Sequence, residues 1–414
     1  MKRMRGWLAP LFLAALCGLS SPALAADKAA VERQFHGWLE KDLWPKAQDE
    51  GVPRRVFDAA FAGVRLNWKL PDLVQPGEKP PKQRRQTQAE FSTPAPYFKE
   101  DRLAQTAAKG RALNAGNADL LARIEKTYGV PGRIVLALWG RETGYGAVSG
   151  SYSAFEVLGT KAFMSTRKDL FETELLAALR IVAKGDVSPG SMKSSWAGAM
   201  GQPQFMPSSF LVYAVDFDGD GRRDIWNSVP DALASIANYL AQKGWQRGRD
   251  WGFEAQIPDT VSCAQEGPDL ARPIADWART GITRVSGRPF PAEELRSDGM
   301  MLVPAGRFGP EFIVTPNFYV LKAYNNSDLY ALYVGNLADR IAYGSGAFQG
   351  RWGNVGHMLR SDVQAMQEAL VRLGHDVGKV DGLAGYKTRR SIGRWQEAHG
   401  MASTCFPSKD LRIR

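Results

Sequence analysis

Apolar residues recur at helical spacing through most of the chain. Residues 28 to about 125 and 118–245 show this pattern, while a proline- and charge-rich stretch near 71–96 indicates a surface loop. One predicted helical face carries Leu233, Ile236, Ala237 and Leu240. Together these patterns predict a mainly α protein with several packed helices.

Residues 253–316 follow a different pattern. Short apolar runs such as MMLVPA and EFIVTP alternate with proline and glycine, which predicts a small β region. Helical spacing returns at 317–342, so we expect one main domain over 28–345 in the mainly α (α+β) class. A glycine-rich linker is predicted at 346–358 and a separate helical unit at 359–412. In that unit one helical face carries Val363, Met366, Leu370 and Leu373.

The first residues read MKRMRGWLAPLFLAALCGLSSPALAAD. A positive start, a short apolar stretch and a small-x-small motif at Ala23–Ala25 predict a secretory signal at 1–25 that is cleaved after export. The apolar stretch is too short for a membrane span. Because Leu16 precedes Cys17 where a small residue is expected, we expect no lipid anchor and a periplasmic location.

Composition narrows the classes of function. The net charge is +10, which in an exported protein suits an anionic envelope polymer rather than nucleic acid, or simply aids solubility. No histidine lies between residues 37 and 356, which excludes a histidine base or histidine-bound metal there. Cys263 and Cys405 could form a disulfide or stay as two free thiols.

The segment VPGRIVLALWGRETGYG, 130–146, is the first candidate for chemistry. Its apolar stripe leads through Leu138 to Glu142 at the end of a predicted helix. The helix dipole, apolar cover by Trp139 and burial should each raise the pKa of Glu142, while Arg141 is expected to point elsewhere on the helix. A protonated carboxyl suits a general acid. The alternative is an ordinary exposed glutamate near a helix end.

A second candidate segment is SSWAGAMGQPQFMPSSF, 194–210. Its glycines let the backbone approach a ligand closely, and Gln204 can both donate and accept hydrogen bonds. Tyr239 and Tyr324 could stack on sugar rings. The alternatives are a turn between core helices and two ordinary core tyrosines.

The third segment, DFDGDGRRDIWNSVPD, 216–231, resembles a calcium loop. Aspartates occupy its positions 1, 3 and 5, glycine follows at the turn position, and Asn227 stands where a bidentate glutamate belongs. Asp231 could close the site in a longer loop, or could instead be an N-cap. Asp224 is a further possible ligand. The segment predicts either a bound cation or a solvated acidic turn.

Taken together, RETGYG, WAGAMGQPQFMPSS, YAVDFDGDG, ANYL and NFYVLKAYNNSDLYA resemble the membrane-bound lytic transglycosylase B family over roughly 30–345. The resemblance implies a lysozyme-like helical core with an added helical region and a small β region. It implies a lyase in which Glu142 is the sole acid/base. Glu142 would protonate the oxygen between N-acetylmuramic acid (MurNAc) and N-acetylglucosamine (GlcNAc), then deprotonate the muramic 6-hydroxyl. The product is 1,6-anhydro-MurNAc, formed without a catalytic cofactor.

The resemblance also implies two sets of binding residues. Those for the substrate are Ser195, Gln204, Tyr239 and Tyr324. Those for a structural Ca²⁺ are Asp216, Asp218, Asp220 and Asp231, with the backbone carbonyl of Arg222. The sequence departs from the family at Asp218, where serine is more usual, and in a longer segment before Asp231.

The tail DVQAMQEALVRLGHDVGKVDGLAGYKTRRSIGRWQ resembles the three-helix peptidoglycan-binding domain, with Asp381-Gly382, Gly385 and Thr388 as its loop residues. The alternative is a generic helical hairpin. A tethered wall-binding module would raise the local substrate concentration.

The implied partners are peptidoglycan glycan strands and proteins of wall synthesis or division. We expect a monomer that binds no nucleic acid. Two other functions remain open: a hydrolytic muramidase of the lysozyme type, and a wall-binding protein without activity.

Overall fold

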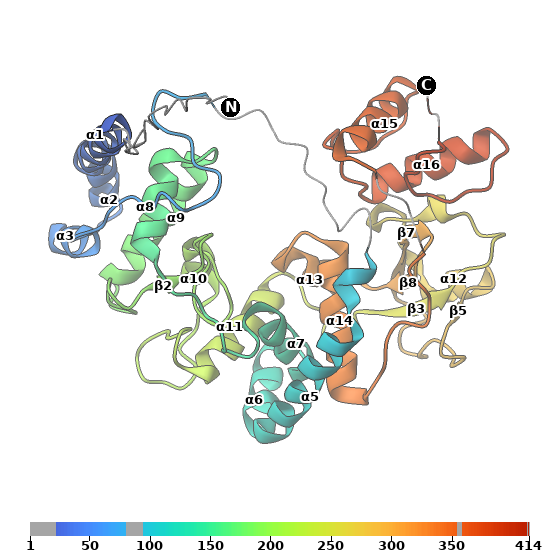
Figure 1. The fold of residues 1–414 in the computed structure, drawn as a ribbon. Coiled ribbons are helices and arrows are strands. Elements are labelled where there is room, and N and C mark those ends of the chain that lie inside the picture. Colours follow the sequence, from blue (N-terminus) through green and yellow to red (C-terminus); the bar gives the residue numbers. More distant parts are fainter. Residues whose placement is uncertain (1–21, 80–93, 354–357, 412, 414) are drawn as a thin grey trace, which may run out of the picture.

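The computed structural model describes residues 22–79, 94–353, 358–411 and 413. Most of the predicted signal segment, 1–25, lies outside these ranges, and its cleavage remains a prediction. Among the helices that the structure describes, none combines the length and apolar character that a membrane span requires. The prediction of a mainly helical α+β fold is confirmed (Figure 1).

A helical region precedes the core. It consists of α1 (Pro22–Trp38), a π-helical turn (Leu39–Leu43), α2 (Trp44–Asp49) and α3 (Arg54–Phe61). Helices α2 and α3 pack on α9 of the core. Phe35 of α1 is completely buried, and its ring meets the edge of Phe163 with the ring centroids 5.5 Å apart. This region corresponds to the added helical region that the sequence predicts.

Most of the remaining helices form the core. They are α5 (Glu100–Gly116), α6 (Ala118–Tyr128), α7 (Gly132–Thr143), α8 (Ala154–Met164), α9 (Lys168–Ala183), α10 (Pro207–Tyr213), α11 (Val229–Gln242), α13 (Pro316–Tyr324) and α14 (Asp328–Tyr343). A 3₁₀ turn (Ala95–Phe98) precedes α5, and a short ribbon pairs β1 (Tyr152–Ser153) with β2 (Lys193–Ser194).

Helix α7 is the centre of this core. Its residues 134–138 are completely buried, which is the pattern of a helix covered on all sides. Helices α5, α6, α11 and α14 contact it. The helix ends because Gly144 adopts a left-handed conformation (φ 59°) that costs glycine little. Glu142 therefore lies in the last turn of a helix that the core encloses.

One antiparallel sheet occupies the predicted β region (Figure 1). Its strands, in spatial order, are β4 (Arg272–Pro273), β6 (Asp298–Leu302), β8 (Glu311–Val314), β3 (Gly252–Gln256) and β5 (Thr283–Arg284). The runs MMLVPA and EFIVTP fall in β6 with β7 (Pro304–Arg307) and in β8, as predicted. Helix α12 (Ile274–Arg279) packs on the sheet, and 3₁₀ turns lie at Cys263–Gln265 and Pro268–Leu270.

The C-terminal module consists of α15 (Arg360–Arg372), α16 (Tyr386–Ala398) and an extended end. The family resemblance implies three helices here, and the described residues form these two. Leu370 and Ile392 are fully buried between them. Leu373 is not on the predicted buried face, because α15 ends before it and its side chain is 49% exposed.

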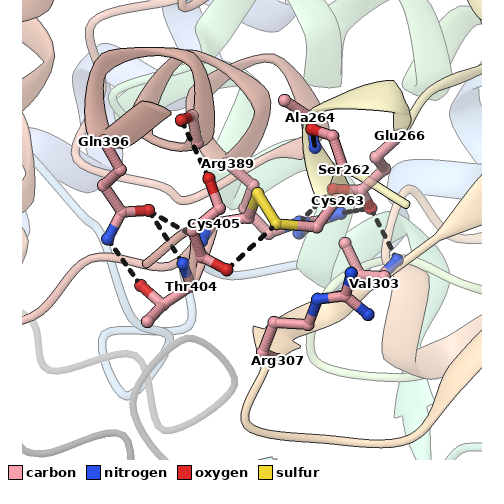
Figure 2. The surroundings of a disulfide bond; sticks show 12 residues. Ser262, Cys263, Ala264, Glu266, Val303, Arg307, Arg389, Gln396, Thr404 and Cys405 are labelled. Carbon is pink, nitrogen blue, oxygen red and sulfur yellow. Dashed lines mark hydrogen bonds and ion pairs between the residues drawn. A yellow bond between two sulfur atoms is a disulfide. The ribbon is translucent and has the colours of Figure 1, made fainter. Parts of the chain in front are cut away.

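The module is attached to the β region by more than chain connectivity. The first residues of the predicted linker pack onto the body: the backbone N–H groups of Gln349 and Gly350 donate to Glu254 over 3.0 and 2.7 Å. Cys263 and Cys405 form a disulfide across the interface, with their Cα atoms 6.1 Å apart (Figure 2). The structure thus decides between the two states of these cysteines that the sequence left open.

Candidate active site and acidic loop

Glu142 is half-buried, and its carboxyl meets a residue from the other end of the domain. The hydroxyl of Tyr330, in the first turn of α14, donates a hydrogen bond to Glu142 Oε1. Burial raises the pKa of Glu142 above its ordinary value, and the Tyr330 hydrogen bond only partly offsets this. Burial also raises the pKa of Tyr330 well above its usual range, so Tyr330 is a neutral donor.

Arg141 lies near this centre. Its guanidinium stacks over the rings of Tyr97 and Tyr333, with 4.8 Å to each centroid, and lies 5.8 Å from the centroid of Tyr330. Its charge contributes to lowering the pKa of Glu142 against the larger effect of burial. As expected, the side chain of Arg141 points away from the Glu142 carboxyl, and its guanidinium folds over neighbouring aromatic rings and donates to the Tyr97 hydroxyl over 2.7 Å.

The glycine-rich segment 194–205 lies against the end of α7. Gln202 joins the two: Trp139 Nε1 donates to Gln202 Oε1 over 2.9 Å, and Gln202 Nε2 donates to the Trp226 carbonyl over 3.1 Å. Sequence reasoning missed Gln202, since only the fold brings it to Trp139. Gly201 is required here, because a Cβ would come within 2.7 Å of the Ile225 carbonyl oxygen.

Ser195 and Gln204 both serve the shape of this segment. The Ser195 hydroxyl accepts hydrogen bonds from the Ala197 and Ala199 N–H groups over 3.3 and 3.2 Å. Gln204 adopts a positive φ of 55° and donates to the Gly201 carbonyl over 2.9 Å. Both side chains are partly exposed, so their remaining polar capacity is available to a ligand.

The two predicted tyrosines lie together, as an aromatic cluster next to the same segment. Tyr239 and Tyr324 meet edge to face with centroids 4.8 Å apart, and Phe205 contacts both rings. Their hydroxyls donate to backbone carbonyls, Tyr239 to Ala323 and Tyr324 to Pro203 over 2.6 Å. After burial, the negative charge of Glu142 is the next influence that raises the pKa of Tyr324. Glu142 therefore lies near enough to Tyr324 to influence its pKa.

The acidic loop brings three of the predicted ligands together. One carboxylate oxygen from each of Asp216, Asp218 and Asp231 lies within 4.8 Å of the others. Asp220 is not in this group, and it forms an exposed ion pair with Arg222 over 3.3 Å. Three carboxylates this close repel one another without a cation, and hard oxygen donors are what Ca²⁺ prefers.

Asp231 organises the loop. Although fully buried, it accepts backbone N–H bonds from Phe217, Asp218 and Asp224. The N-cap of α11 is Ser228, whose hydroxyl accepts from Asp231 N over 3.3 Å. Asp231 is therefore not the helix cap that the sequence analysis considered as an alternative.

Two segments of the chain match known protein families. Residues 34–339 match the family described as "Transglycosylase SLT domain", and residues 360–406 match "Putative peptidoglycan binding domain". The chain resembles SltB3 from Pseudomonas aeruginosa, solved in complex with NAG-NAM-pentapeptide. The identity is 38% and the TM-score 0.81, over 92% of this chain and 99% of that chain. The same relative, solved with NAG-anhNAM-pentapeptide, gives a TM-score of 0.78 at 36% identity, over 91% of this chain and 97% of that chain.

Two relatives from Escherichia coli are more distant. Membrane-bound lytic murein transglycosylase B is 34% identical over 227 residues, which are 54% of this chain and 60% of that protein. The match thus spans less than two thirds of that relative. Lytic transglycosylase Slt35, solved in complex with calcium, is 30% identical with a TM-score of 0.51, over 62% of this chain and 79% of that chain.

Proposed function

We propose that this chain, which belongs to the transglycosylase SLT domain family, is a lytic transglycosylase that cleaves the bond between MurNAc and GlcNAc in peptidoglycan. Glu142 is its acid and base in this proposal. The observation that carries it is the half-buried carboxyl of Glu142, which keeps a raised pKa while a neutral tyrosine hydroxyl holds it. A raised pKa favours the protonated form of this carboxyl, which is the form that can donate a proton to a glycan.

The reaction uses the carboxyl of Glu142 twice, first as an acid and then as a base. Glu142 gives its proton to the glycosidic oxygen while the bond from C1 to that oxygen breaks. The carboxylate then takes the proton of the muramic 6-hydroxyl as that oxygen bonds to C1. This closes the 1,6-anhydro ring, consumes no water and returns Glu142 to its protonated form. The acetamido group of the substrate stabilises the positive charge at C1 between the two steps.

A two-carboxylate hydrolase is the alternative, and the surroundings of Glu142 argue against it. Hydrolysing glycosidases place a second carboxyl about 5–9.5 Å from the acid. The influences on the pKa of Glu142 are burial, the Tyr330 hydrogen bond and the charge of Arg141, and no second carboxylate of the described residues is among them. A single acid/base therefore fits this site better.

Product analysis tests the proposal. Purified wild type and Glu142→Gln are incubated with sacculi, and the released muropeptides are identified by mass spectrometry. Anhydro ends from the wild type and none from the variant are the expected result. Reducing ends would identify a muramidase. No release by either protein, with binding to sacculi retained, would identify a wall-binding protein without activity. Equal release by both proteins would exclude Glu142 as the catalyst.

The substrate contacts form the next part of the proposal. Gln204 and Ser195 lie on the segment beside α7, with partly exposed polar side chains that can bind sugar hydroxyl and amide groups. Tyr239 and Tyr324 pack against this segment through Phe205. We further propose that the C-terminal module binds the wall, that the protein is exported to the periplasm, and that it meets proteins of wall synthesis or division there.

We also propose a structural Ca²⁺ in the acidic loop. Asp216, Asp218 and Asp231 would hold the ion, with Asp220 and the Arg222 carbonyl completing its oxygen ligands. Support comes from the convergence of three carboxylates on one point. A cation there would fix the loop that Gln202 joins to α7 through the Trp226 carbonyl, so its role is stability and not catalysis.

A further inference from the structure

Arg389 of α16 is a completely enclosed arginine that joins three parts of the molecule. Its side chain is 2% exposed, and it binds Glu266 of the β region through two hydrogen bonds, Nε to Oε2 over 2.9 Å and Nη2 to Oε1 over 2.6 Å (Figure 2). Nη2 also donates to Asp328 Oδ2 over 3.0 Å. Nη1 donates to the Ala384 carbonyl over 2.7 Å within the module. The planar fork of an arginine is needed to reach all of these acceptors at once.

Asp328 is the first residue of α14, and Tyr330 lies two residues further on in the same turn. Ser327 caps this turn by accepting the Tyr330 N–H over 3.1 Å. Asp328 also forms an ion pair with Lys322 over 2.7 Å. Burial by itself would raise the pKa of Asp328, but the charges of Lys322 and Arg389 outweigh burial and lower this pKa to about 2. A charged, clamped Asp328 thus fixes the turn from which Tyr330 reaches Glu142.

We infer that Arg389 is a positioning residue for the reaction: it holds Asp328, and thereby sets the Tyr330 hydroxyl against the Glu142 carboxyl. This inference rests on the proposed role of Glu142. It gives the C-terminal module a second task besides binding the wall, because one of its side chains helps to build the catalytic centre.

Other links hold the module in place without reaching α14. Arg390 binds Asp269 through paired contacts of 2.9 and 2.8 Å, and the disulfide joins Cys263 to Cys405. Among the ion pairs of the described residues, the pair of Arg389 with Asp328 is the one that joins the module to α14. The attachment of the module and the placing of Tyr330 can therefore be separated by mutation.

Two variants of the full chain test the inference, with a matched control. Arg389→Lys keeps the charge but loses the fork, and Asp328→Asn keeps the shape but loses the charge. Asp269→Asn is the control, because it makes the same change at the acceptor of the neighbouring arginine and does not touch α14. The substrate is a soluble tetrasaccharide of alternating GlcNAc and MurNAc, so that anchoring to sacculi does not contribute.

We expect Arg389→Lys and Asp328→Asn each to lower kcat about tenfold with little change in KM, because a misplaced catalytic contact affects the chemical step. The alkaline limb of their kcat profiles should also move to higher pH, since a weaker Tyr330 hydrogen bond raises the pKa of Glu142. Asp269→Asn should retain wild-type kcat and pH profile. If Arg389→Lys does not fold, Asp328→Asn alone carries the test.

A double-mutant cycle separates positioning from a general loss of structure. In a Tyr330→Phe background, Arg389→Lys should cause no further loss of kcat, because the contact it positions is already gone. An equal loss in both backgrounds, or a wild-type kcat and pH profile in Arg389→Lys and Asp328→Asn, would overturn the inference. Activity retained in Glu142→Gln would instead overturn the proposed function, so the two failures are distinguishable.

Discussion

The hydroxyl of Tyr330 donates a hydrogen bond to Oε1 of Glu142, although 188 positions separate the two residues in sequence. The bond joins the first turn of α14 to the last turn of α7. It fixes one oxygen of the carboxyl and leaves the other to meet a substrate. Burial keeps the pKa of Glu142 raised in spite of this bond, so the carboxyl is oriented while its protonated form is favoured.

Removing that hydroxyl should change the pH dependence of activity in a defined direction. A hydrogen bond to the carboxylate stabilises its charged form, so Tyr330→Phe should raise the pKa of Glu142 further. Activity that requires protonated Glu142 is then retained to higher pH, while kcat at the optimum falls by about 10- to 100-fold because the carboxyl loses its orientation. Initial rates on soluble glycan from pH 4 to 9 measure both effects. An alkaline limb that moves to lower pH would contradict this account.

Glu142→Gln should abolish turnover without harming the fold. A general acid contributes about 10²–10⁴-fold to a rate, and Gln cannot donate a proton in its place. A raised pKa in the folded state means that wild type loses stability as pH rises through that pKa, a loss that the neutral amide avoids. The Tm of the variant relative to wild type should therefore be higher at pH 8 than at pH 4. A variant that is less stable at pH 8 would indicate a structural role for the carboxylate.

The acidic loop should respond to calcium. A ligand that binds only the folded state raises the free energy of unfolding by about 2.7 kcal/mol when its free concentration is one hundred times Kd. The Tm of wild type should rise with Ca²⁺ and fall with a chelator, and Mg²⁺ should have a smaller effect because it binds carboxylates less flexibly. Asp216→Asn should reduce the response. A Tm that is the same in Ca²⁺ and in chelator would exclude the proposed ion.

The disulfide should contribute to global stability. Cys263 and Cys405 are 142 residues apart. Closing so long a loop lowers the entropy of the unfolded chain and raises the free energy of unfolding by roughly 3–5 kcal/mol. The double variant Cys263→Ser/Cys405→Ser should unfold at lower urea concentration than oxidised wild type. Reduced wild type should unfold like the variant, which controls for the substitutions themselves. Equal urea midpoints for all three would show that the non-covalent contacts of the module suffice.

Sequence patterns were informative where function depends on one continuous segment. The helix that ends at Glu142, the aspartates of the acidic loop and the strands near 300 and 312 all follow from local spacing, and the family resemblance is confirmed. Tyr239 and Tyr324 were predicted separately, and the fold places them edge to face.

What the patterns missed depends on contacts between distant segments. The sequence around Tyr330 does not distinguish it from any tyrosine on the buried face of a helix. Its hydrogen bond to Glu142 exists because the fold packs α14 beside α7. The polar residues around Arg389 in the sequence are typical of an exposed arginine. In the fold it is buried against the carboxylates of Glu266 and Asp328, which come from other parts of the chain. The cysteine pairing was open for the same reason, because sequence gives no distance between residues 142 apart.

The fixed attachment of the C-terminal module changes what wall binding can do. A module on a loose tether lets the enzyme sample many nearby strands, and it acts through effective concentration alone. A module held by a disulfide and the buried Arg389–Glu266 pair keeps its orientation. A strand gripped by this module and a strand at Glu142 would then lie at one set separation and angle. The enzyme would then bind only where the spacing between strands of the sacculus matches that separation. The sites of cleavage would therefore depend on the mesh size of the polymer as well as on its chemistry.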